Sequence, residues 1–475
     1  MMQDKYPYEF LIRCIALLLV PIAFSGCEGS GKIILSEIHV GLHNNNELKI
    51  QLEVTTNTPA DIYAEYWKEK DSTKKWSSTV ARNTSKGRLI ICNIFPETDY
   101  AYRIVAKNKN AATISKVYTF KTNALPMFLQ DQFRADTIKS INPPGEFNDG
   151  LMLINKRYAP GVAYLVDRKA EIRWYHMVAD LGFKVLHFTQ DHTLLSIMGG
   201  NDEPTSYGHE ILELNLSGDT VLHLKKGQND LPANIHHEIL KNDKGELVTI
   251  YVDKKVMDLR AIGGKDKDTV SGDGIIVMDK TGKKLWQWSV FNTLDPLKDK
   301  HLLKIKKDWM HANSLSYDRD GNFLLSFYNN GQIWKIDSKS GKVIWKFGKG
   351  GTIVKPAECD FTQTHAVHIN QQGDLMFFDN GVEKQQSGVF AMKIDEQNQS
   401  SRIDMYIKLP KQIFNGRMGS AYMINDTCIL VCCSKRHIIV LTDRKGTLLW
   451  TMETAVPTYR AEFIRGSELE PYLKP

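Results

Sequence analysis

The sequence lacks several patterns that define whole classes of protein. It has no run of five or six Lys or Arg and no basic stripe with interleaved aromatic residues, which argues against nucleic-acid binding. No Cys-x-x-Cys spacing occurs among its seven cysteines, so neither a zinc knuckle nor a disulfide framework is indicated. The remaining composition is that of a folded protein. The net charge of +6 favours anionic small molecules, and the alternative is that most of it belongs to a solvated basic surface.

The N-terminus has the pattern of an export signal. Lys5 and Arg13 accompany an apolar run, CIALLLVPIAF at residues 14–24, which is too short to span a bilayer. The run leads into FSGC, which resembles a bacterial lipobox ending at Cys27, and EGSG follows as a flexible tether. The alternative is an ordinary signal peptide with Cys27 as an incidental thiol.

This pattern predicts a lipoprotein signal peptide at residues 1–26 and a tether at 27–32 that begins with lipidated Cys27. Bacterial lipoproteins carry several acyl chains, which together give stable anchoring. We therefore expect an exported protein that faces the periplasm and is held at the outer membrane by its lipid.

Residues 33–125 have the pattern of a β-sandwich. Stretches such as LKIQLEV and AYRIVAKN alternate apolar and polar residues, as strands with one buried face do. The turn PETDY, which ends at Tyr100, resembles the corner of a fibronectin type III domain, where a tyrosine tethers the fold. A sandwich of other topology is the alternative, and NALP at residues 123–126 is the expected exit linker.

From residue 126 onward the sequence repeats. A strand ends in Asp or Asn, a short turn follows that usually contains Gly, and the next strand often ends in Trp, as in IVMDKTGKKLW. The Asp or Asn that anchors each repeat is Asp167, Asn215, Asp279, Asp337, Asp395 or Asp443. Their spacing, from 48 residues (167 to 215) to 64 (215 to 279), is that of propeller blades with insertions. The fold class is therefore all-β, with a six-bladed β-propeller at residues 126–475.

The five cysteines after the signal do not indicate a redox site. They are Cys92, Cys359, Cys428, Cys432 and Cys433. Two of them share one face of the strand CILVCC, which is typical of core packing. The adjacent pair leaves a strained vicinal disulfide as a minor alternative.

Three histidines occupy matching places in successive repeats. His237, His311 and His365 each precede a strand, a turn with Gly and another strand. Their distances to the turn glycine, eight or ten residues, are even, which keeps them on one pleat face. Since the first strand of each blade lines the channel, we expect the three imidazoles to meet near one mouth. His236 should point to the opposite face, although the register leaves open which of His236 and His237 faces the channel.

These residues belong to specific motifs. DWMHANS begins at Asp308 and contains His311 and Asn313, whereas THA around His365 is followed by FDNG with Asn380. Together with His-His-Glu at residues 236–238 and the later GRMGSAYMIN, they resemble the bacterial aryl-sulfate sulfotransferases over nearly the whole mature chain.

The resemblance implies a ping-pong reaction in which a phenolic sulfate donor gives its sulfuryl group to His365 and a phenol then accepts it. His311 and His237 match the residues that hold sulfate oxygens and exchange protons, and His236, Asn313 and Asn380 are expected to bind substrate. It implies no nucleotide sulfate donor, and we expect no cofactor and no metal. A neutral imidazole is a good nucleophile near neutral pH.

The sequence departs from this family at one position. Where its members carry Arg after a Leu-Ser-x motif, this chain reads LSFY, with Tyr328. A phenol supplies a hydrogen bond but no fixed charge. Arg417 is the candidate substitute. Without one, the rate would fall by about 10²–10³, as for loss of one oxyanion donor.

Two other functions remain open. A non-catalytic propeller that binds an anionic or aromatic ligand is favoured by the missing Arg. A quinone-dependent dehydrogenase is suggested by the Trp repeats and the Cys432-Cys433 pair, but such enzymes usually have eight blades and a carboxylate-rich calcium site, and no such site is evident here.

Overall fold

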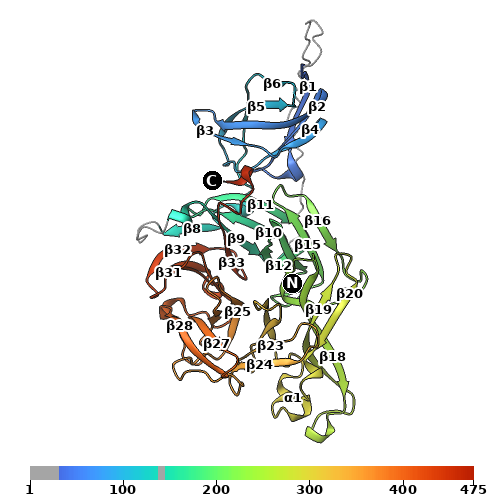
Figure 1. Ribbon diagram of the computed structural model, residues 1–475, viewed down its shortest axis with the longest axis vertical. Coiled ribbons are helices and arrows are strands. Elements are labelled where there is room, and N and C mark those ends of the chain that lie inside the picture. Colours follow the sequence, from blue (N-terminus) through green and yellow to red (C-terminus); the bar gives the residue numbers. More distant parts are fainter. Residues whose placement is uncertain (1–31, 137–144, 475) are drawn as a thin grey trace, which may run out of the picture. The chain divides into compact units, whose positions relative to one another are not determined.

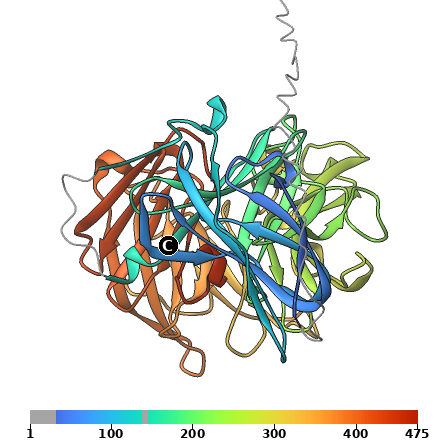
Figure 2. The same cartoon turned by 90° about the horizontal axis from the view of Figure 1, so that it is seen from above.

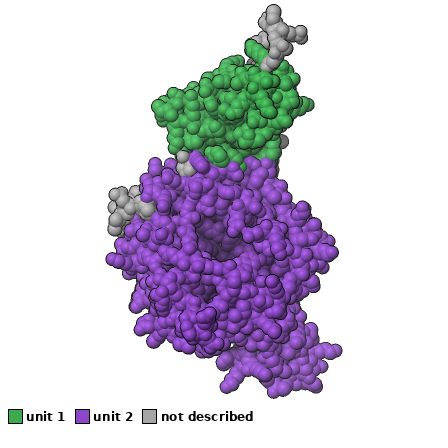
Figure 3. All heavy atoms as spheres, viewed as in Figure 1, with its two compact units in different colours: residues 1–128, 471–473 green, residues 129–470, 474–475 purple. Residues whose placement is uncertain are grey.

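The computed structural model describes residues 32–136 and 145–474. The expected signal peptide and Cys27 lie outside these residues. The chain forms two compact units, unit 1 with residues 1–128 and 471–473 and unit 2 with residues 129–470 and 474–475 (Figure 3).

Helices contribute little to the described residues. One short α-helix is present, α1 (Leu302–Ile305). The 3-10 turns are η1 (His43–Asn45), η2 (Met127–Leu129), η3 (Gly145–Asn148), η4 (Arg260–Ile262), η5 (Val290–Asn292), η6 (Pro296–Lys298), η7 (Lys411–Ile413), η8 (Ser434–Arg436) and η9 (Pro471–Leu473). None of the helices in residues 32–136 and 145–474 combines the length and apolar character needed to cross a bilayer.

The described part of unit 1 is a β-domain organised around one long strand. Its strands are β1 (Leu35–Leu42), β2 (Ile50–Lys68), β3 (Asp71–Ser77), β4 (Ala81–Ile91), β5 (Asp99–Lys107), β6 (Ala112–Ile114) and β7 (Tyr118–Lys121). The first half of β2 pairs with β1 and β4, and its second half pairs mainly with β5 and β3. The domain is therefore sandwich-like, as the alternating strands predicted.

Tyr100 tethers a corner of unit 1. Its hydroxyl accepts a hydrogen bond from the backbone N–H of Phe95 at 2.9 Å, and its ring stacks on Phe120 with centroids 5.4 Å apart. This is the tyrosine that the PETDY motif indicated, and the bond closes back onto the residue before that motif.

The described strands of unit 2 form six sheets, which are the six predicted blades (Figure 1). Blade 1 contains β33 (Ala461–Ile464), β9 (Leu151–Lys156), β10 (Gly161–Val166) and β11 (Ile172–Val178), and blade 2 contains β12 (Gly182–Phe188), β13 (Thr193–Gly199), β15 (Glu210–Asn215) and β16 (Thr220–Leu224). Blade 3 contains β14 (Tyr207–Gly208), β17 (Ile235–Lys241), β18 (Leu247–Met257), β19 (Asp268–Met278) and β20 (Lys284–Ser289). Blade 4 contains β21 (Ala312–Tyr317), β22 (Phe323–Phe327), β23 (Gln332–Ile336) and β24 (Val343–Gly348). Blade 5 contains β25 (Thr364–Ile369), β26 (Leu375–Asp379), β27 (Gly388–Asp395) and β28 (Ser400–Lys408), and blade 6 contains β29 (Ser420–Met423), β30 (Cys428–Cys433), β31 (Ile438–Asp443), β32 (Leu448–Thr454) and β8 (Phe133–Asp136).

The ring closes through strands from both ends of unit 2. The C-terminal strand β33 pairs with β9 and becomes the inner strand of blade 1, while β8 pairs with β32 in blade 6. The inner strands neighbour one another in the order β33, β12, β17, β21, β25, β29 and again β33. Figure 2 shows green and yellow blades on one side of this ring and orange and red ones on the other. Closure by the last strand was not predicted.

The repeated turns and tryptophans account for the blade geometry. Each Asp or Asn caps the turn between the third and fourth strands, as when Asn215 accepts a hydrogen bond from the N–H of Gly218, whose φ is 99°. The indole N–H of Trp174 in blade 1 donates to Leu216 O in the turn of blade 2 at 2.9 Å. Trp450 in blade 6 makes the equivalent bond to Arg168 O in blade 1 at 2.9 Å, so the tryptophans fill the wedges between blades.

Cys92 is buried, and the cysteines of unit 2, Cys359, Cys428, Cys432 and Cys433, are buried and form no disulfide. This agrees with core packing and leaves no disulfide between Cys432 and Cys433. The six-bladed architecture also differs from the eight blades usual in the quinone-dependent alternative.

Candidate active site

Three histidines from neighbouring blades come together at one end of the channel. His237 lies in β17, His311 directly precedes β21 and His365 lies in β25. The ring centroids of His237 and His311 are 5.0 Å apart. The ring of Tyr328 lies 5.6 Å from that of His311 and 5.6 Å from that of His365. We call His237, His311 and His365 the histidine cluster.

Backbone irregularities at the start of the inner strands place these imidazoles. The register of β17 shifts directly after His236, and that of β25 shifts directly after His365. His237 and His311 have φ values of 62° and 55°, and Ala366 has 52°. Side chains other than glycine adopt such angles at an energetic cost, and strained residues of this kind concentrate at functional sites. Counting pleats from the turns therefore did not suffice to orient the histidines.

His236 does not point away from its neighbour, as simple strand alternation had indicated. The Nδ1 atoms of His236 and His237 are 2.7 Å apart because the left-handed backbone of His237 breaks the alternation. The ring of His236 stacks on Tyr207, with centroids 4.6 Å apart, and its Nε2 lies 3.3 Å from an Asp273 carboxylate oxygen. His236 is fully buried and supports the histidine cluster from behind.

Asn380 determines which nitrogen of His365 carries the proton. The amide group of Asn380 donates to two backbone carbonyls, Asn415 O at 2.7 Å and Met418 O at 2.9 Å. Its Oδ1 therefore faces His365 and accepts a hydrogen bond from Nδ1 at 2.6 Å. The proton of neutral His365 is on Nδ1, and Nε2 keeps its lone pair.

Electrostatics keep two members of the cluster neutral. Burial lowers the pKa of His365 to about 3, the charges of His311 and Arg460 act in the same direction, and the hydrogen bond to Asn380 opposes them. Burial is also the main cause that holds the pKa of His237 well below its ordinary value, followed by the charge of His236. At neutral pH both rings are uncharged.

His311 differs from the other two because it has a carboxylate partner. Its Nδ1 lies 2.6 Å from an Asp308 carboxylate oxygen. Burial disfavours the charged ring, but this hydrogen bond, the charge of Asp308 and the charge of Asp273 together raise the pKa of His311 above its ordinary value. The cluster therefore combines a neutral imidazole in His365 with one that takes up a proton more readily in His311.

Asn313 is buried beside the cluster, but its polar atoms are already paired. Its amide donates to Thr364 O at 2.6 Å, and its Oδ1 accepts a hydrogen bond from the hydroxyl of Ser326. The first bond connects the inner strands of blades 4 and 5, and the second joins the first two strands of blade 4. Asn313 thus holds the strands that carry His311 and His365 in place and has little free capacity for substrate.

Tyr328 and Arg417 lie beside each other at the same end of the channel. The hydroxyl of Tyr328 donates to Gly416 O at 3.0 Å. Burial raises the pKa of Tyr328, and the charge of Arg417 opposes this rise, which places the guanidinium near the phenol. Arg417 is exposed. The position where a cation was expected therefore holds the half-buried ring of Tyr328, and Arg417 lies near it.

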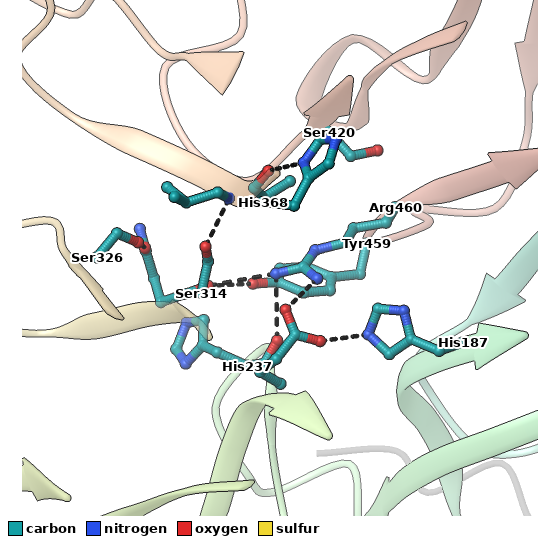
Figure 4. A network of polar contacts seen from close by, with 12 residues as sticks. His187, His237, Ser314, Ser326, His368, Ser420, Tyr459 and Arg460 are labelled. Carbon is teal, nitrogen blue, oxygen red and sulfur yellow. Dashed lines mark hydrogen bonds and ion pairs between the residues drawn. The ribbon is translucent and has the colours of Figure 1, made fainter. Parts of the chain in front are cut away.

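Sequence reasoning missed Arg460, which precedes the closing strand β33. Its side chain is 4% exposed and pairs with the carboxylate of Glu238. The guanidinium also donates to His237 O and to Asn313 O, each at 3.4 Å. Arg460 therefore ties together blades 1, 3 and 4 directly behind the cluster, and Figure 4 shows it between His187 and His237.

The second carboxylate oxygen of Glu238 faces His187, whose other ring nitrogen contacts Glu462. Burial opposes a charge on His187, but the two carboxylates raise its pKa to about 10. The four groups Glu462, His187, Glu238 and Arg460 form a series of ion pairs with alternating charges, which we call the ion-pair chain. Its partners are far apart in sequence, for example by 222 residues for Arg460 and Glu238, and no local pattern signals such pairs.

The described residues contain no group of three or more His, Cys, Asp or Glu arranged to hold a metal ion. The site consists instead of imidazoles, their carboxylate and amide partners, and nearby cations.

Comparison with known families identifies the chain. The profile of the arylsulfotransferase (ASST) family matches residues 137–407, which include all three members of the histidine cluster. The protein belongs to the arylsulfotransferase family. It is accordingly a sulfotransferase in general terms, and the family implies aryl sulfates and phenols as its small-molecule substrates.

Other comparisons give only distant similarities. A search of curated proteins finds no match. A solved structure of a protein of unknown function from Bacteroides caccae is 11% identical, with 67% of this chain and 99% of that chain covered and a TM-score of 0.44. An inactive variant of virginiamycin B lyase from Staphylococcus aureus is 12% identical, with coverages of 68% and 99% and a TM-score of 0.32. These similarities are too weak to bear on function.

Proposed function

We propose that this arylsulfotransferase moves a sulfuryl group from an aryl sulfate to a phenol through a covalent intermediate on Nε2 of His365. The observation that carries the proposal is the 2.6 Å hydrogen bond between His365 Nδ1 and Asn380 Oδ1, which leaves Nε2 unprotonated. Burial keeps the ring neutral, so the lone pair is available at neutral pH.

In the first half-reaction the lone pair of Nε2 attacks sulfur, and the bond between sulfur and the aryl oxygen breaks. The bonding electrons leave with the phenolate, which takes a proton from His311. Because Asp308 favours the protonated form of His311, this residue is the better proton donor of the cluster. The positive charge that develops on His365 lies against Asn380 Oδ1.

In the second half-reaction a phenol returns that proton to His311 while its oxygen attacks the sulfur. The bond between Nε2 and sulfur breaks, and His365 regains its lone pair. His237 contacts the sulfuryl oxygens, as an uncharged hydrogen-bond donor. The donor is the phenolic sulfate ester itself, so no nucleotide sulfate takes part.

One observation favours a second candidate function. Tyr328 fills the place of a cation and lies between His311 and His365. If no other group supplies the missing charge, the propeller binds an anionic or aromatic ligand without turning it over.

Incubation with 4-nitrophenyl sulfate separates these functions. Transfer predicts that intact-mass analysis detects one added sulfuryl group on His365 and that nitrophenolate release continues when a phenol is added. His365→Ala should abolish both signals, with His176→Ala as a control remote from the cluster. Saturable binding by a folded protein with neither signal would overturn the transfer proposal and support the second candidate.

We also propose that the mature protein begins at lipidated Cys27 and faces the periplasm from the outer membrane. The support is the FSGC motif after a short apolar run, followed by EGSG. Mass spectrometry of the membrane-extracted protein should detect an acylated Cys27 at the N-terminus, and an unmodified Cys27 would contradict the proposal.

A further inference from the structure

A buried arginine near the histidine cluster has no anionic partner. Arg157 follows β9 in blade 1 and is 3% exposed. In the described residues its guanidinium hydrogen-bonds only to backbone carbonyls, Pro457 O at 2.6 Å and Thr205 O at 3.4 Å, and no carboxylate pairs with it. A buried charge normally has a counter-charge, so an unpaired one indicates a ligand.

The topology places Arg157 at the same end of the channel as the cluster. Neighbouring strands of a blade are antiparallel, so the loops after the second strands open at the end where the first strands begin. Tyr328 and Asn380 occupy these loops in blades 4 and 5, and Arg157 occupies the loop in blade 1. In a ring of six blades, blade 1 lies opposite blade 4. Arg157 therefore stands across the mouth from Tyr328.

Contacts link Arg157 to the rest of the mouth. Its Nε bonds Pro457 O, two residues before Tyr459, whose ring lies 6.0 Å from that of His237. Burial lowers the pKa of Arg157, and repulsion by Arg417 acts in the same direction. Arg417 precedes the inner strand of blade 6 and makes no side-chain hydrogen bond or ion pair within the described residues. Blades 6 and 1 are adjacent in the ring, so both arginines lie at the same end of the channel, and neither has a carboxylate partner within the described residues.

Two of the cations at this end have carboxylate partners. In the ion-pair chain, Arg460 and His187 pair with the carboxylates of Glu238 and Glu462. Arg157 and Arg417, by contrast, form no ion pair with a carboxylate within the described residues. An aryl sulfate monoester brings a single negative charge, and that charge is engaged at His365. A second anionic group on the substrate would give these two guanidinium groups a counter-charge. The surface of unit 2 is hollowed near its centre, as expected for a channel that opens to solvent (Figure 3).

We propose that Arg157 and Arg417 form an anion-binding subsite, and that the substrates are phenols with a second anionic group such as a carboxylate. This rests on the proposed function, because the subsite receives the far end of a molecule whose phenolic oxygen reacts at His365. The phenol ring of the substrate then lies beside the ring of Tyr328, and its anionic substituent points toward blades 6 and 1.

The test compares two acceptors of equal size that differ in charge, 4-hydroxyphenylacetate and 4-hydroxyphenylacetamide, with 4-nitrophenyl sulfate as donor. We expect kcat/KM to favour the carboxylate by about tenfold or more, the value of one charge-assisted hydrogen bond. Arg417→Gln and Arg157→Gln should each reduce this ratio toward one, and Arg157→Lys should keep part of it. Arg168→Gln, in a turn at the other end of blade 1, is the matched control and should retain the ratio.

Because Arg157 also bonds two backbone carbonyls, Arg157→Gln can destabilise the fold. Arg417 is exposed, so Arg417→Gln tests the subsite without that effect. A wild-type ratio of one or less, or a ratio that both glutamine variants retain, overturns the subsite. Calorimetric binding of the two phenols without donor separates the proposals. Preferential binding of the carboxylate that is lost in Arg417→Gln supports the subsite even if no sulfuryl transfer occurs, whereas transfer without any preference overturns the subsite alone.

Discussion

Asn380 Oδ1 accepts the Nδ1 proton of His365 at 2.6 Å, and the amide of Asn380 is held by two backbone carbonyls. This amide therefore cannot rotate to offer its N–H group without breaking both bonds. A single side chain fixes both the orientation of the imidazole and the nitrogen that carries the lone pair. The proposed nucleophile depends on this arrangement more than on its own sequence motif.

Replacing Asn380 should therefore impair the first half-reaction. Asn380→Ala leaves His365 free to rotate and to change tautomer, and misplacement of a reacting group costs on the order of 10²-fold in rate. We expect kcat for 4-nitrophenyl sulfate to fall by about that factor while the protein stays folded. A variant with full kcat would show that Asn380 does not position the nucleophile.

Asn380→Asp tests the charge state of His365 separately. In the native protein burial lowers the pKa of His365 to about 3, so the ring is neutral above that pH. A carboxylate at this position favours the protonated ring and raises that pKa. Since only the neutral ring attacks sulfur, activity of the variant should be lost at a higher pH than in the native protein when the pH is lowered. An unchanged acid limb in the pH–rate profile would contradict this role.

The proton donor should determine the alkaline limb of the same profile. Asp308 and Asp273 raise the pKa of His311 despite its burial, so the group is protonated up to a higher pH than an ordinary histidine. Transfer from donors with poor leaving groups should decline as pH rises through that pKa. Asp308→Asn removes the main partner and should move this decline to lower pH, whereas 4-nitrophenyl sulfate, with its good leaving group, should respond less. Equal responses of both donors would exclude His311 as the acid.

Tyr328→Arg should increase the rate if charge at that position limits transfer. The ring of Tyr328 lies 5.6 Å from both His311 and His365, which is within reach of a guanidinium built on the same backbone. A cation there stabilises charge on the sulfuryl oxygens, and the gain should approach the factor of about 10²–10³ associated with one oxyanion donor. Tyr328→Phe is the control, since it keeps the ring but removes the bond to Gly416 O. No gain in Tyr328→Arg would mean that other cations already meet this need.

The blade pattern was predictable from sequence because it is local. Each Asp or Asn caps its own turn within a few residues, as Asp443 does for the N–H of Thr447, and each Trp reaches only the next blade. The motifs around His311 and His365 are equally local. The six-bladed fold and the choice of candidate histidines therefore followed from short stretches of sequence.

What sequence did not reveal depends on distant contacts and on backbone strain. The orientation predicted for His236 was wrong because the positive φ of His237 interrupts the alternation of the strand. Nothing in the sequence around a histidine indicates such an angle. Arg460 and His187 acquire their partners only when β33 closes the ring beside β9. Asn313 was expected to bind substrate, but its partners Thr364 and Ser326 come from two blades.

The ion-pair chain leads to a prediction about the pH dependence of stability. His187 has a pKa raised from 6.5 to about 10 by Glu238 and Glu462 against the effect of burial. A histidine whose pKa is raised on folding stabilises the native state fully below its unfolded pKa, and this contribution is lost as pH rises through the folded value. The free energy of unfolding should thus decline between about pH 6.5 and pH 10, and His187→Leu should flatten this decline.

Arg460→Met leaves Glu238 buried without its main partner and should cost about 3–5 kcal/mol at neutral pH, as other broken buried pairs do. Adding Glu238→Gln should restore part of that loss, because the uncompensated charge is then removed. Urea unfolding of the single and double variants at several pH values measures both effects. Additive losses of unfolding free energy in the double variant would show that Arg460 and Glu238 act independently, so that the ion-pair chain is not a coupled unit.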